Sequence, residues 1–181
     1  MHIRHVSFDH PDALKLSDQV QAEYGARYGD DGDATPLAPA DFEPPNGLYL
    51  IAYDELGTPV ASGGWRAQDE NGEGNADGDA ELKRMYVVER MRGRGLARRI
   101  LAALEEDARA AGRTRMVLET GSKQPEAVAL YTSSGYEPGG RACGRPHAHG
   151  AGDRLQAARG GGAVHVQRVR AVREVRLLPL P

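Results

Sequence analysis

Residues 81–120 follow the pattern of a strand, a helix and a second strand, and this pattern limits the possible folds more than any other part of the chain. The first strand is predicted over 81–88, and the second, which is apolar, over 114–120. Between them, apolar residues recur at helical spacing from Gly95 onward, and Gly112 stands where a helix would end. Such a unit joins two parallel strands through a right-handed crossover. We therefore expect an α/β fold.

The residues before this unit predict further elements of the same domain. HIRHVSF is typical of a short strand, and HPDALKLSDQVQAEYGARYG is typical of a helix that carries Leu14, Val20 and Tyr24. Two apolar strands flank the turn DELGTP within 47–67, which indicates a hairpin. Residues 29–46 are rich in glycine, proline and aspartate and predict a long loop of the kind that is often functional.

The first strand of the strand–helix–strand unit has an irregular phase. Leu82, Met85 and Val87 cannot all lie on one face of a regular strand, where side chains alternate with a period of two. One extra residue near Lys83 or Arg84 would restore the alternation as a β-bulge, which is a frequent feature beside active sites. The alternative is that Leu82 faces a different layer, and periodicity alone leaves both interpretations open.

Length and charge narrow the class of protein. The chain has 181 residues, of which 40% are hydrophobic, and this suits one globular domain with a real core. Residues 1–138 carry 24 acidic and 15 basic side chains, whereas 139–181 carry 2 acidic and 8 basic ones. The acidic body argues against nucleic acid as a partner, because that kind of affinity rests on neutralising phosphates.

Targeting signals and metal ligands are not evident in the sequence. No apolar run is long enough to span a membrane, and MHIRHVSFDH lacks the basic start and apolar stretch of a signal peptide. The single cysteine, Cys143, cannot form an internal disulfide, which agrees with a reducing compartment. We therefore expect a cytoplasmic protein with no membrane partner. Cys143, His147 and His149 lack a clear fourth ligand, so we expect no metal site.

The stretch VERMRGRGLARRIL places the small residues Gly93, Gly95 and Ala97 at the mouth of the predicted helix. The first N–H groups of a helix lack internal partners and carry the positive end of its dipole, so a flexible cationic turn there favours an anionic ligand. The P-loop string GxxxxGK[ST] is absent, and the fingerprint GxGxxG fails at Arg98. The pattern R-x-x-G-x-A, which begins at Arg92, remains. The alternative is a surface helix with solvated arginines.

The sequence resembles the GNAT superfamily of acetyl-CoA-dependent N-acetyltransferases in two runs, ELKRMYVVERMRGRGLARRILAALEEDARAAG and RMVLETGSKQPEAVALYTSSGYEP. The pattern R-x-x-G-x-A matches the family signature [RQ]-x-x-G-x-[GA], and ALYTSSGYE follows it at the family spacing. The match is close over 81–138 and looser over 1–138. It implies a single GNAT-like domain over 1–138, with a mixed central sheet flanked by helices and a bulged, splayed strand at the cofactor site.

Residues 139–181 depart from the family and form an atypical tail dominated by arginine, glycine, alanine and proline. The family normally completes its sheet with a strand or hairpin after GYEP, and no aromatic and apolar segment of that kind is evident. AVHVQRVRAVREV alternates valine with polar residues, as a strand does. The segment before it has few core-forming residues and is predicted to be poorly ordered.

The resemblance implies acetyl-CoA as the co-substrate. The turn would hold its diphosphate, the bulged strand would pair with its pantetheine arm, and a backbone N–H near Val87 would meet its thioester carbonyl. Gln124 stands where many family members have an asparagine that contacts the cofactor arm. The implied cofactor-binding residues are Met85, Tyr86, Val87, Arg92, Gly93, Arg94, Gly95, Leu96, Ala97 and Gln124.

Acetyl transfer to an amine needs two proton movements. Tyr131 matches the family tyrosine that protonates the departing CoA thiolate, and the alternative is a core aromatic residue on a short helix. An amine with a pKa near ~10.4 is only about one part in 10³ neutral at pH 7, so a base or a water chain must take its proton. Glu81 is the first candidate for this base, with a salt-bridged carboxylate as the alternative. Glu119 is a weaker rival.

These features predict an enzyme that moves an acetyl group from acetyl-CoA to a primary amine of a small molecule or peptide, through a tetrahedral intermediate, as a monomer or homodimer. A non-catalytic acyl-CoA-binding module is the alternative. A nucleic-acid adaptor is disfavoured because 139–181 contain no aromatic residue. Acidic residues in the long loop would attract a cationic amine, although such runs are usually solvated surface. They are Asp30, Asp31, Asp33, Asp41 and Glu43.

Overall fold

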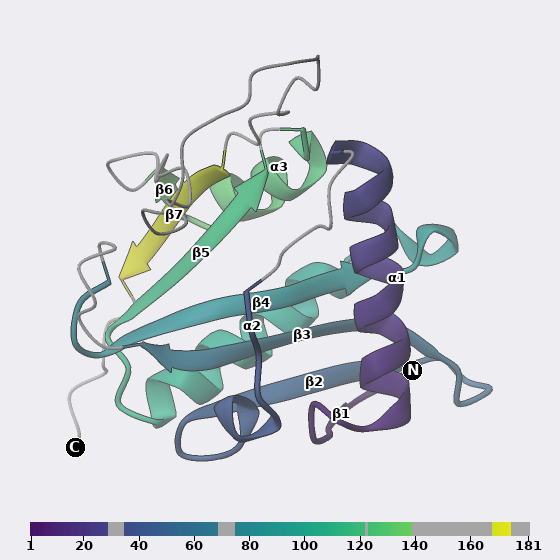
Figure 1. Ribbon diagram of the computed structural model, residues 1–181, viewed down its shortest axis with the longest axis horizontal. Helices are drawn as coiled ribbons and strands as arrows, with labels where there is room; N and C mark the ends of the chain where they lie inside the picture. The colour runs from purple at the N-terminus through teal and green to yellow at the C-terminus, as the bar shows by residue number, and fades with distance from the viewer. Residues whose placement is uncertain (29–34, 69–74, 122, 139–167, 175–181) are drawn as a thin grey trace, which may run out of the picture.

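The computed structural model describes residues 1–28, 35–68, 75–121, 123–138 and 168–174. The strands form one sheet in the order β1-β2-β3-β4-β5-β7-β6 (Figure 1). They are β1 (His2–His5), β2 (Gly47–Tyr53), β3 (Pro59–Gln68), β4 (Asp79–Val87), β5 (Arg115–Gly121), β6 (Glu137–Pro138) and β7 (Arg168–Glu174). The helices are α1 (Pro11–Tyr28), α2 (Leu96–Ala110) and α3 (Pro125–Ser133), with short 3-10 helices η1 (Pro39–Phe42) and η2 (Glu89–Met91).

The sheet is mixed, as predicted. Strands β1 to β4 pair antiparallel, and β4 pairs parallel with β5. Because α2 connects β4 to β5, the predicted strand–helix–strand unit is confirmed. The predicted hairpin is formed by β2 and β3, and Asp54 closes its turn by accepting hydrogen bonds from the N–H groups of Leu56 and Thr58 at 3.0 and 2.9 Å.

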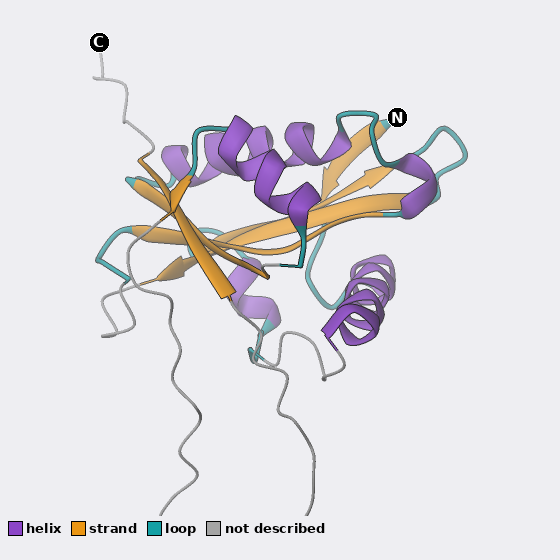
Figure 2. Ribbon diagram, turned by 90° about the horizontal axis from the view of Figure 1, so that it is seen from above, coloured by secondary structure: helices purple, strands orange, loops and turns teal. Residues whose placement is uncertain are grey.

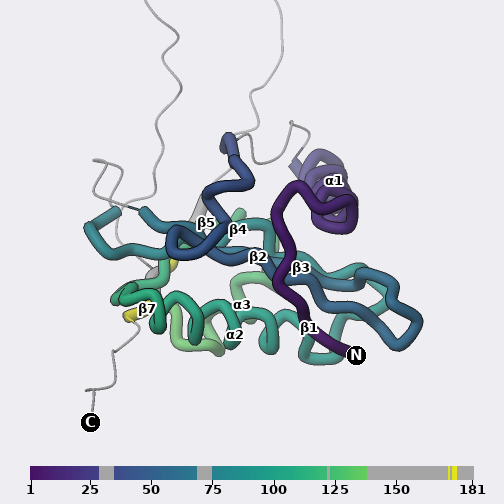
Figure 3. The backbone as a smooth tube through the Cα atoms, turned by 90° about the horizontal axis from the view of Figure 1, so that it is seen from below, coloured from purple at the N-terminus to yellow at the C-terminus, as the bar shows by residue number. Residues whose placement is uncertain are grey.

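Helices cover both faces of the sheet, with α1 and η1 on one face and α2 and α3 on the other (Figures 2 and 3). On the α2 side, the buried Trp65 donates from its indole nitrogen to Asp107 at 2.8 Å. On the α1 side, Phe8, Phe42 and Tyr49 pack against one another in tilted and T-shaped contacts, with ring centroids 4.8 to 5.5 Å apart. The sheet therefore has an apolar core on each side.

Helix α1 is the predicted first helix. Its contact face carries Ala13, Leu16 and Val20, which are buried, and Tyr24, which is half-buried. The buried positions from Ala13 to Val20 repeat at spacings of three and four residues, and Leu14, which breaks this spacing, is 46% exposed.

Strand β4 contains the predicted bulge. The register between β3 and β4 shifts between Ser62 and Gly64, so that Arg84 and Met85 together oppose one residue of β3. Arg84 has a φ of 54°, in the left-handed region that few residues other than glycine adopt. This confirms the extra residue predicted near Lys83 or Arg84, and it turns the strand at that point.

Strands β4 and β5 separate soon after they begin to pair. The ladder joins residues 79–81 to residues 115–117 and extends no further among the described residues. Beyond it the two strands diverge (Figure 1), which confirms the predicted splay. Asp79, which is 1% exposed, secures the start of this short ladder by accepting two hydrogen bonds of 2.6 Å from Arg115.

The chain beyond residue 138 contributes β7, which lies between β5 and β6 and runs antiparallel to both. The alternation in AVHVQRVRAVREV is therefore confirmed as a strand over 168–174. This segment completes the sheet after GYEP by pairing with β5, without the aromatic residues that the family usually has there. The predicted poor order concerns residues that lie outside the described ones.

A buried carboxylate joins β7 to α2. Glu105 is 7% exposed and accepts two hydrogen bonds from Arg173, at 2.8 and 2.7 Å, and one from the Tyr136 hydroxyl at 2.9 Å. Burial raises the pKa of Tyr136, and the Glu105 carboxylate raises it further, so this hydroxyl stays protonated and continues to donate. Arg173 is therefore the main cationic partner of a carboxylate that has little access to water.

We expect Arg173→Met to lower the free energy of unfolding by about 1 to 3 kcal/mol, because it leaves the Glu105 carboxylate buried with one neutral donor. Denaturant melts of the full chain measure this. The double variant with Glu105→Gln should recover part of the loss, since it removes the unpaired charge. Equal stability of Arg173→Met and the parent would contradict the packing of β7 against α2.

Candidate functional site

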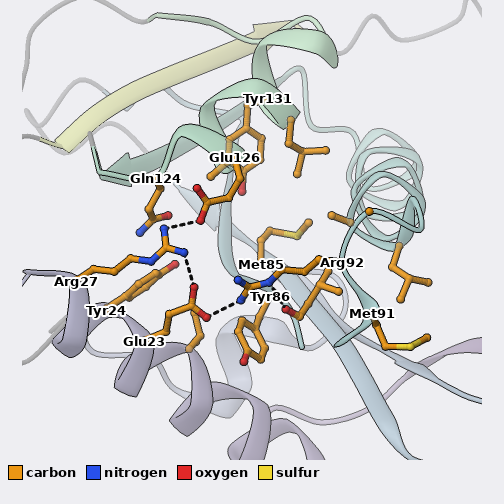
Figure 4. Close-up of a pocket in the computed structure, with 17 residues that line it drawn as sticks. Glu23, Tyr24, Arg27, Met85, Tyr86, Met91, Arg92, Gln124, Glu126 and Tyr131 are labelled. Atoms are coloured by element: carbon orange, nitrogen blue, oxygen red, sulfur yellow. Dashed lines mark hydrogen bonds and ion pairs between the residues drawn. The ribbon is translucent and has the colours of Figure 1, made fainter. Parts of the chain in front are cut away.

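A pocket of about 240 Å³ lies where β4 and β5 diverge (Figure 4). Helix α1 borders it from one face of the sheet, and α2 and α3 border it from the other, so the pocket occupies the gap left by the splay. It is lined by Val20, Glu23, Tyr24 and Arg27 of α1, Met85, Tyr86 and Val87 of β4, Met91, Arg92 and Gly93 of the turn, Leu96 and Ala97 of α2, and Gln124, Glu126, Ala127, Leu130 and Tyr131 beside or on α3.

The turn between β4 and α2 has the backbone conformation that an anion site needs. Gly93 and Gly95 have φ angles of 74° and 76°, and no atom of the described residues lies within 4 Å of a Cβ built on either. Gly95 is the N-cap of α2, so the first N–H groups of that helix have no partner within it. A ligand phosphate can approach this backbone closely and meet the positive end of the helix dipole.

Strand β4 also turns backbone groups into the gap. The N–H of Val88 donates to the Val60 carbonyl on β3 at 3.0 Å. Because the C=O and N–H of one peptide unit point in opposite directions, the Val87 carbonyl points away from β3 and toward the gap. Arg92 occupies this carbonyl by donating from Nε at 3.0 Å. An extended ligand could pair with this edge in the same way as an added strand.

Four charged side chains cross the pocket as an ion-pair chain that runs Arg92, Glu23, Arg27, Glu126 (Figure 4). Arg92 Nη2 lies 2.6 Å from Glu23 Oε2, and Arg27 Nη2 lies 2.7 Å from Glu23 Oε1. Arg27 also pairs with Glu126. Burial raises the pKa of Glu126, but its own backbone N–H and Arg27 outweigh burial and lower it overall. The chain links α1 to the turn and to α3.

Tyr131 reaches into the pocket from α3 (Figure 4) and is 8% exposed. Its ring packs against Tyr136 in a T-shaped contact with centroids 5.6 Å apart. Burial raises the pKa of Tyr131, and Tyr24 raises it further, so the hydroxyl is protonated at neutral pH. Gln124, at the N-cap of α3, lines the same wall and accepts a hydrogen bond from the Thr120 hydroxyl at 3.4 Å.

The pocket gathers most of the residues that the sequence singled out. Tyr131 lines it, as do eight of the ten implied cofactor-binding residues. Arg94 and Gly95 are exposed and lie outside the lining, in the turn at its border. The eight are Met85, Tyr86, Val87, Arg92, Gly93, Leu96, Ala97 and Gln124.

Glu81 lies outside this lining, in a polar network on β3 and β4. Its Oε2 accepts hydrogen bonds from Arg66 and Gln68, both at 2.9 Å, and its Oε1 pairs with Lys83 at 3.0 Å. Two cations and an amide therefore hold this carboxylate in one position. Glu119, the weaker rival, is exposed and also lies outside the lining.

Other predicted features are only partly covered by the structure. Asp41 accepts a hydrogen bond from the Ala38 N–H at 2.9 Å and pairs with Arg66 at 3.5 Å, whereas Glu43 lies 3.9 Å from His5. Within the described residues, no three metal-binding side chains form a group, and no helix is long and apolar enough to cross a membrane. Outside the described residues lie Asp30, Asp31, Asp33, Cys143, His147 and His149.

The contribution of α1 to the pocket was missed at the sequence level. Glu23 and Arg27 stand four residues apart, and that spacing alone favours an ion pair on a helix. Their other partners, Arg92 and Glu126, come from distant parts of the chain, and no local pattern connects them with α1. The pairing depends on how α1 packs across the sheet.

The family model for the acetyltransferase (GNAT) family matches residues 14–136. The chain belongs to this family, and it is an acyltransferase. Enzymes of the family use acetyl-CoA and act on amines of small molecules or peptides.

Individual relatives agree with the family. An IAA acetyltransferase from Azospirillum brasilense is 39% identical over 92 residues, which is 51% of this chain and only 56% of that relative. The Escherichia coli K12 protein named uncharacterized N-acetyltransferase YjgM is 31% identical over 134 residues, which are 71% of this chain and 77% of that protein. The structure of yncA, a putative acetyltransferase from Salmonella typhimurium with its cofactor Acetyl-CoA, is similar to this chain with a TM-score of 0.65. The two sequences are 17% identical, and the match covers 100% of this chain and 97% of the yncA chain. At that identity it shows a shared fold.

A pair of glycine variants tests the anion site at the turn. Gly95→Glu and Gly112→Glu each place a side chain at a left-handed φ, at opposite ends of α2, where the described residues leave room for it. The left-handed φ should cost each variant about 1 to 2 kcal/mol of stability, and the helix dipole should make the cost smaller at Gly95 than at Gly112. Gly95→Glu alone should weaken CoA binding in calorimetry, by about 10-fold or more, because its carboxylate would face the phosphates. Equal CoA affinity in the two variants would remove the phosphate assignment.

Proposed function

We propose that this protein is an N-acetyltransferase that moves an acetyl group from acetyl-CoA to a primary amine of a small molecule or peptide. The observation that carries the proposal is the pocket at the β4–β5 splay, where the edge of β4 beyond its ladder with β5, the N-terminus of α2 and Tyr131 meet. The family's use of acetyl-CoA supports the choice of co-substrate, and so does the yncA structure. The names of the Azospirillum and Escherichia relatives support the reaction type.

The turn and α2 would hold the diphosphate. The absence of a Cβ at Gly93 and Gly95 lets phosphate oxygens reach the first N–H groups of α2, and Arg92 and Arg94 add positive charge. Acetyl-CoA supplies the activated thioester, which the amine attacks directly. The protein itself needs to align the two reactants and to manage charge and protons.

Strand β4 would align the cofactor arm. The Val87 backbone points into the gap, so an arm that carries amides can pair with it as a strand would. The Val87 N–H then serves as the donor that stabilises negative charge on the thioester oxygen. Met85 and Tyr86 complete the edge, and Gln124 offers an amide from the opposite wall.

Tyr131 would donate to the departing sulfur. Because burial raises the pKa of Tyr131, its hydroxyl is protonated and available as a donor at neutral pH. A thiol is a stronger acid than this phenol, so complete proton transfer from Tyr131 to the thiolate is uphill. The tyrosine therefore acts mainly by hydrogen bonding to the sulfur as its negative charge develops, and this places its contribution toward the low end of general-acid effects.

Glu81 remains our proposed acceptor for the amine proton, reached through water, because it is the carboxylate that precedes the bulge on β4. Its partners Arg66 and Lys83 hold this carboxylate in place beside the bulge. If Glu81 takes the proton, Glu81→Gln lowers kcat/KM most strongly at low pH. A loss of stability with an unchanged pH profile would assign it a structural role.

The first test of the function is release of CoA thiol from acetyl-CoA in the presence of paired acceptors. Suitable pairs are phenethylamine with phenylalanine, tyramine with tyrosine, and cadaverine with lysine, together with a short peptide that has a free N-terminus. We expect at least one amine to raise the rate well above hydrolysis without an acceptor. Binding of acetyl-CoA without transfer to any acceptor would count against the proposal.

Two tyrosine variants separate catalysis from packing. Tyr131→Phe keeps the ring and should lower kcat by about 10²-fold while acetyl-CoA affinity and Tm barely change. Tyr136→Phe is the matched control, because its hydroxyl is bonded to Glu105 away from the pocket lining. That variant should lose stability with little change in kcat. Turnover of Tyr131→Phe within about three-fold of the parent would exclude an acid at this position.

A further inference from the structure

Arg92 makes two contacts that the proposed cofactor would break, one with the Val87 carbonyl and one with Glu23. Its Nε donates to the Val87 carbonyl at 3.0 Å, and its Nη2 pairs with Glu23 at 2.6 Å. Its guanidinium also lies 5.9 Å from the centre of the Tyr86 ring. A cofactor arm along β4 needs the Val87 carbonyl, and a diphosphate at the turn is a stronger anionic partner than one carboxylate. Both contacts would move Arg92 away from Glu23.

The loss of Arg92 would leave the rest of the ion-pair chain with a net negative charge. The ion-pair chain contains two guanidinium groups and two carboxylates, so it is neutral while Arg92 belongs to it. Once Arg92 turns to the diphosphate, Glu23, Arg27 and Glu126 remain with a net charge of −1. Glu23 keeps Arg27 at Oε1, but its Oε2 loses its cation.

The position of Glu23 makes this loss costly. Its side chain is only 28% exposed, so water replaces the missing partner incompletely. An ammonium group has three donors and a full positive charge, and it would restore the lost interaction. Val20 and Leu130 supply apolar surface in the same pocket for the carbon skeleton that carries such a group.

We propose that Glu23 recognises the ammonium group of the acceptor, and that Arg92 and this ammonium alternate at Glu23 Oε2. The inference rests on the proposed function, since it requires the diphosphate at the turn. Cofactor binding then creates the amine site, and the amine strengthens cofactor binding by the same factor. The acceptor class is a simple cationic amine. An α-amino acid would bring its carboxylate toward Glu23 and Glu126, while Arg27 is already paired with both.

Glu23→Gln tests this assignment because its two expected effects have opposite signs. Calorimetry with CoA and no acceptor should give a Kd that is about two- to five-fold lower than in the parent, since Arg92 no longer has to leave a carboxylate. For the best amine of the acceptor panel, kcat/KM should fall by about 10- to 100-fold. The preference for that amine over its amino-acid counterpart should shrink at the same time. A purely structural defect would weaken both ligands together.

Glu126→Gln is the matched control, because it removes a carboxylate from the same chain and leaves the contact between Arg92 and Glu23 intact. Its CoA affinity should stay within about two-fold of the parent. Thermal melting of both variants checks that they fold. Unchanged or weaker CoA binding in Glu23→Gln, or a parental kcat/KM, would overturn the role of Glu23 and would leave the proposed function standing. If the parent acetylates no amine, the proposed function fails and this inference fails with it.

Discussion

The early separation of β4 and β5 is the constraint on which the site depends. The two strands share a ladder over only three residue pairs, and the bulge at Arg84 then redirects β4. A strand edge that loses its neighbour exposes backbone N–H and C=O groups, and these groups are costly when they are buried without partners. Here they border a pocket, and Arg92 satisfies one of them at Val87. The fold thus keeps a gap in its sheet that a ligand backbone can fill.

Ion pairs from helix α1 cross the gap between β4 and β5. Helix α1 packs on the face opposite to α2 and α3, yet its residues Glu23 and Arg27 reach both the turn and α3 (Figure 4). These contacts are ion pairs between partly exposed groups, which can exchange one charged partner for another. The apolar side of α1, with Val20 buried, provides the stable attachment. The helix therefore combines a fixed core contact with exchangeable polar contacts at the site.

The local features of this fold were accessible from the sequence. The phase of Leu82, Met85 and Val87 indicated a bulge, and the alternative was that Leu82 faces a different layer. The turn followed from glycines that need a positive φ at the start of a helix. Both depend on neighbours in sequence. The contact between Glu23 and Arg92 and the pairing of β7 with β5 depend on packing between distant segments, which no window of sequence contains.

The sequence indicated which residue types belong to the site, but it did not give the burial and the partners of each side chain. Glu81 was weighed as a base and as a salt-bridged carboxylate, and the choice depended on Arg66 from another strand. Tyr131 was weighed as an acid and as a core aromatic residue, and it is both buried against Tyr136 and directed into the pocket. Such distinctions need the third dimension, because burial and partners set the chemistry of a titratable group.

The position of β7 has a consequence for how the chain folds during synthesis. Strand β5 pairs with a segment that emerges from the ribosome long after α2 and α3, so the earlier elements can assemble while one edge of β5 is still open. An open strand edge invites pairing with other chains. Glu105 is bonded to Arg173, so it gains this cationic partner only when β7 joins the sheet. An apolar strand in the place of β7 would leave the Glu105 carboxylate without its cation, so the ion pair that fixes the finished sheet would also disfavour such a strand.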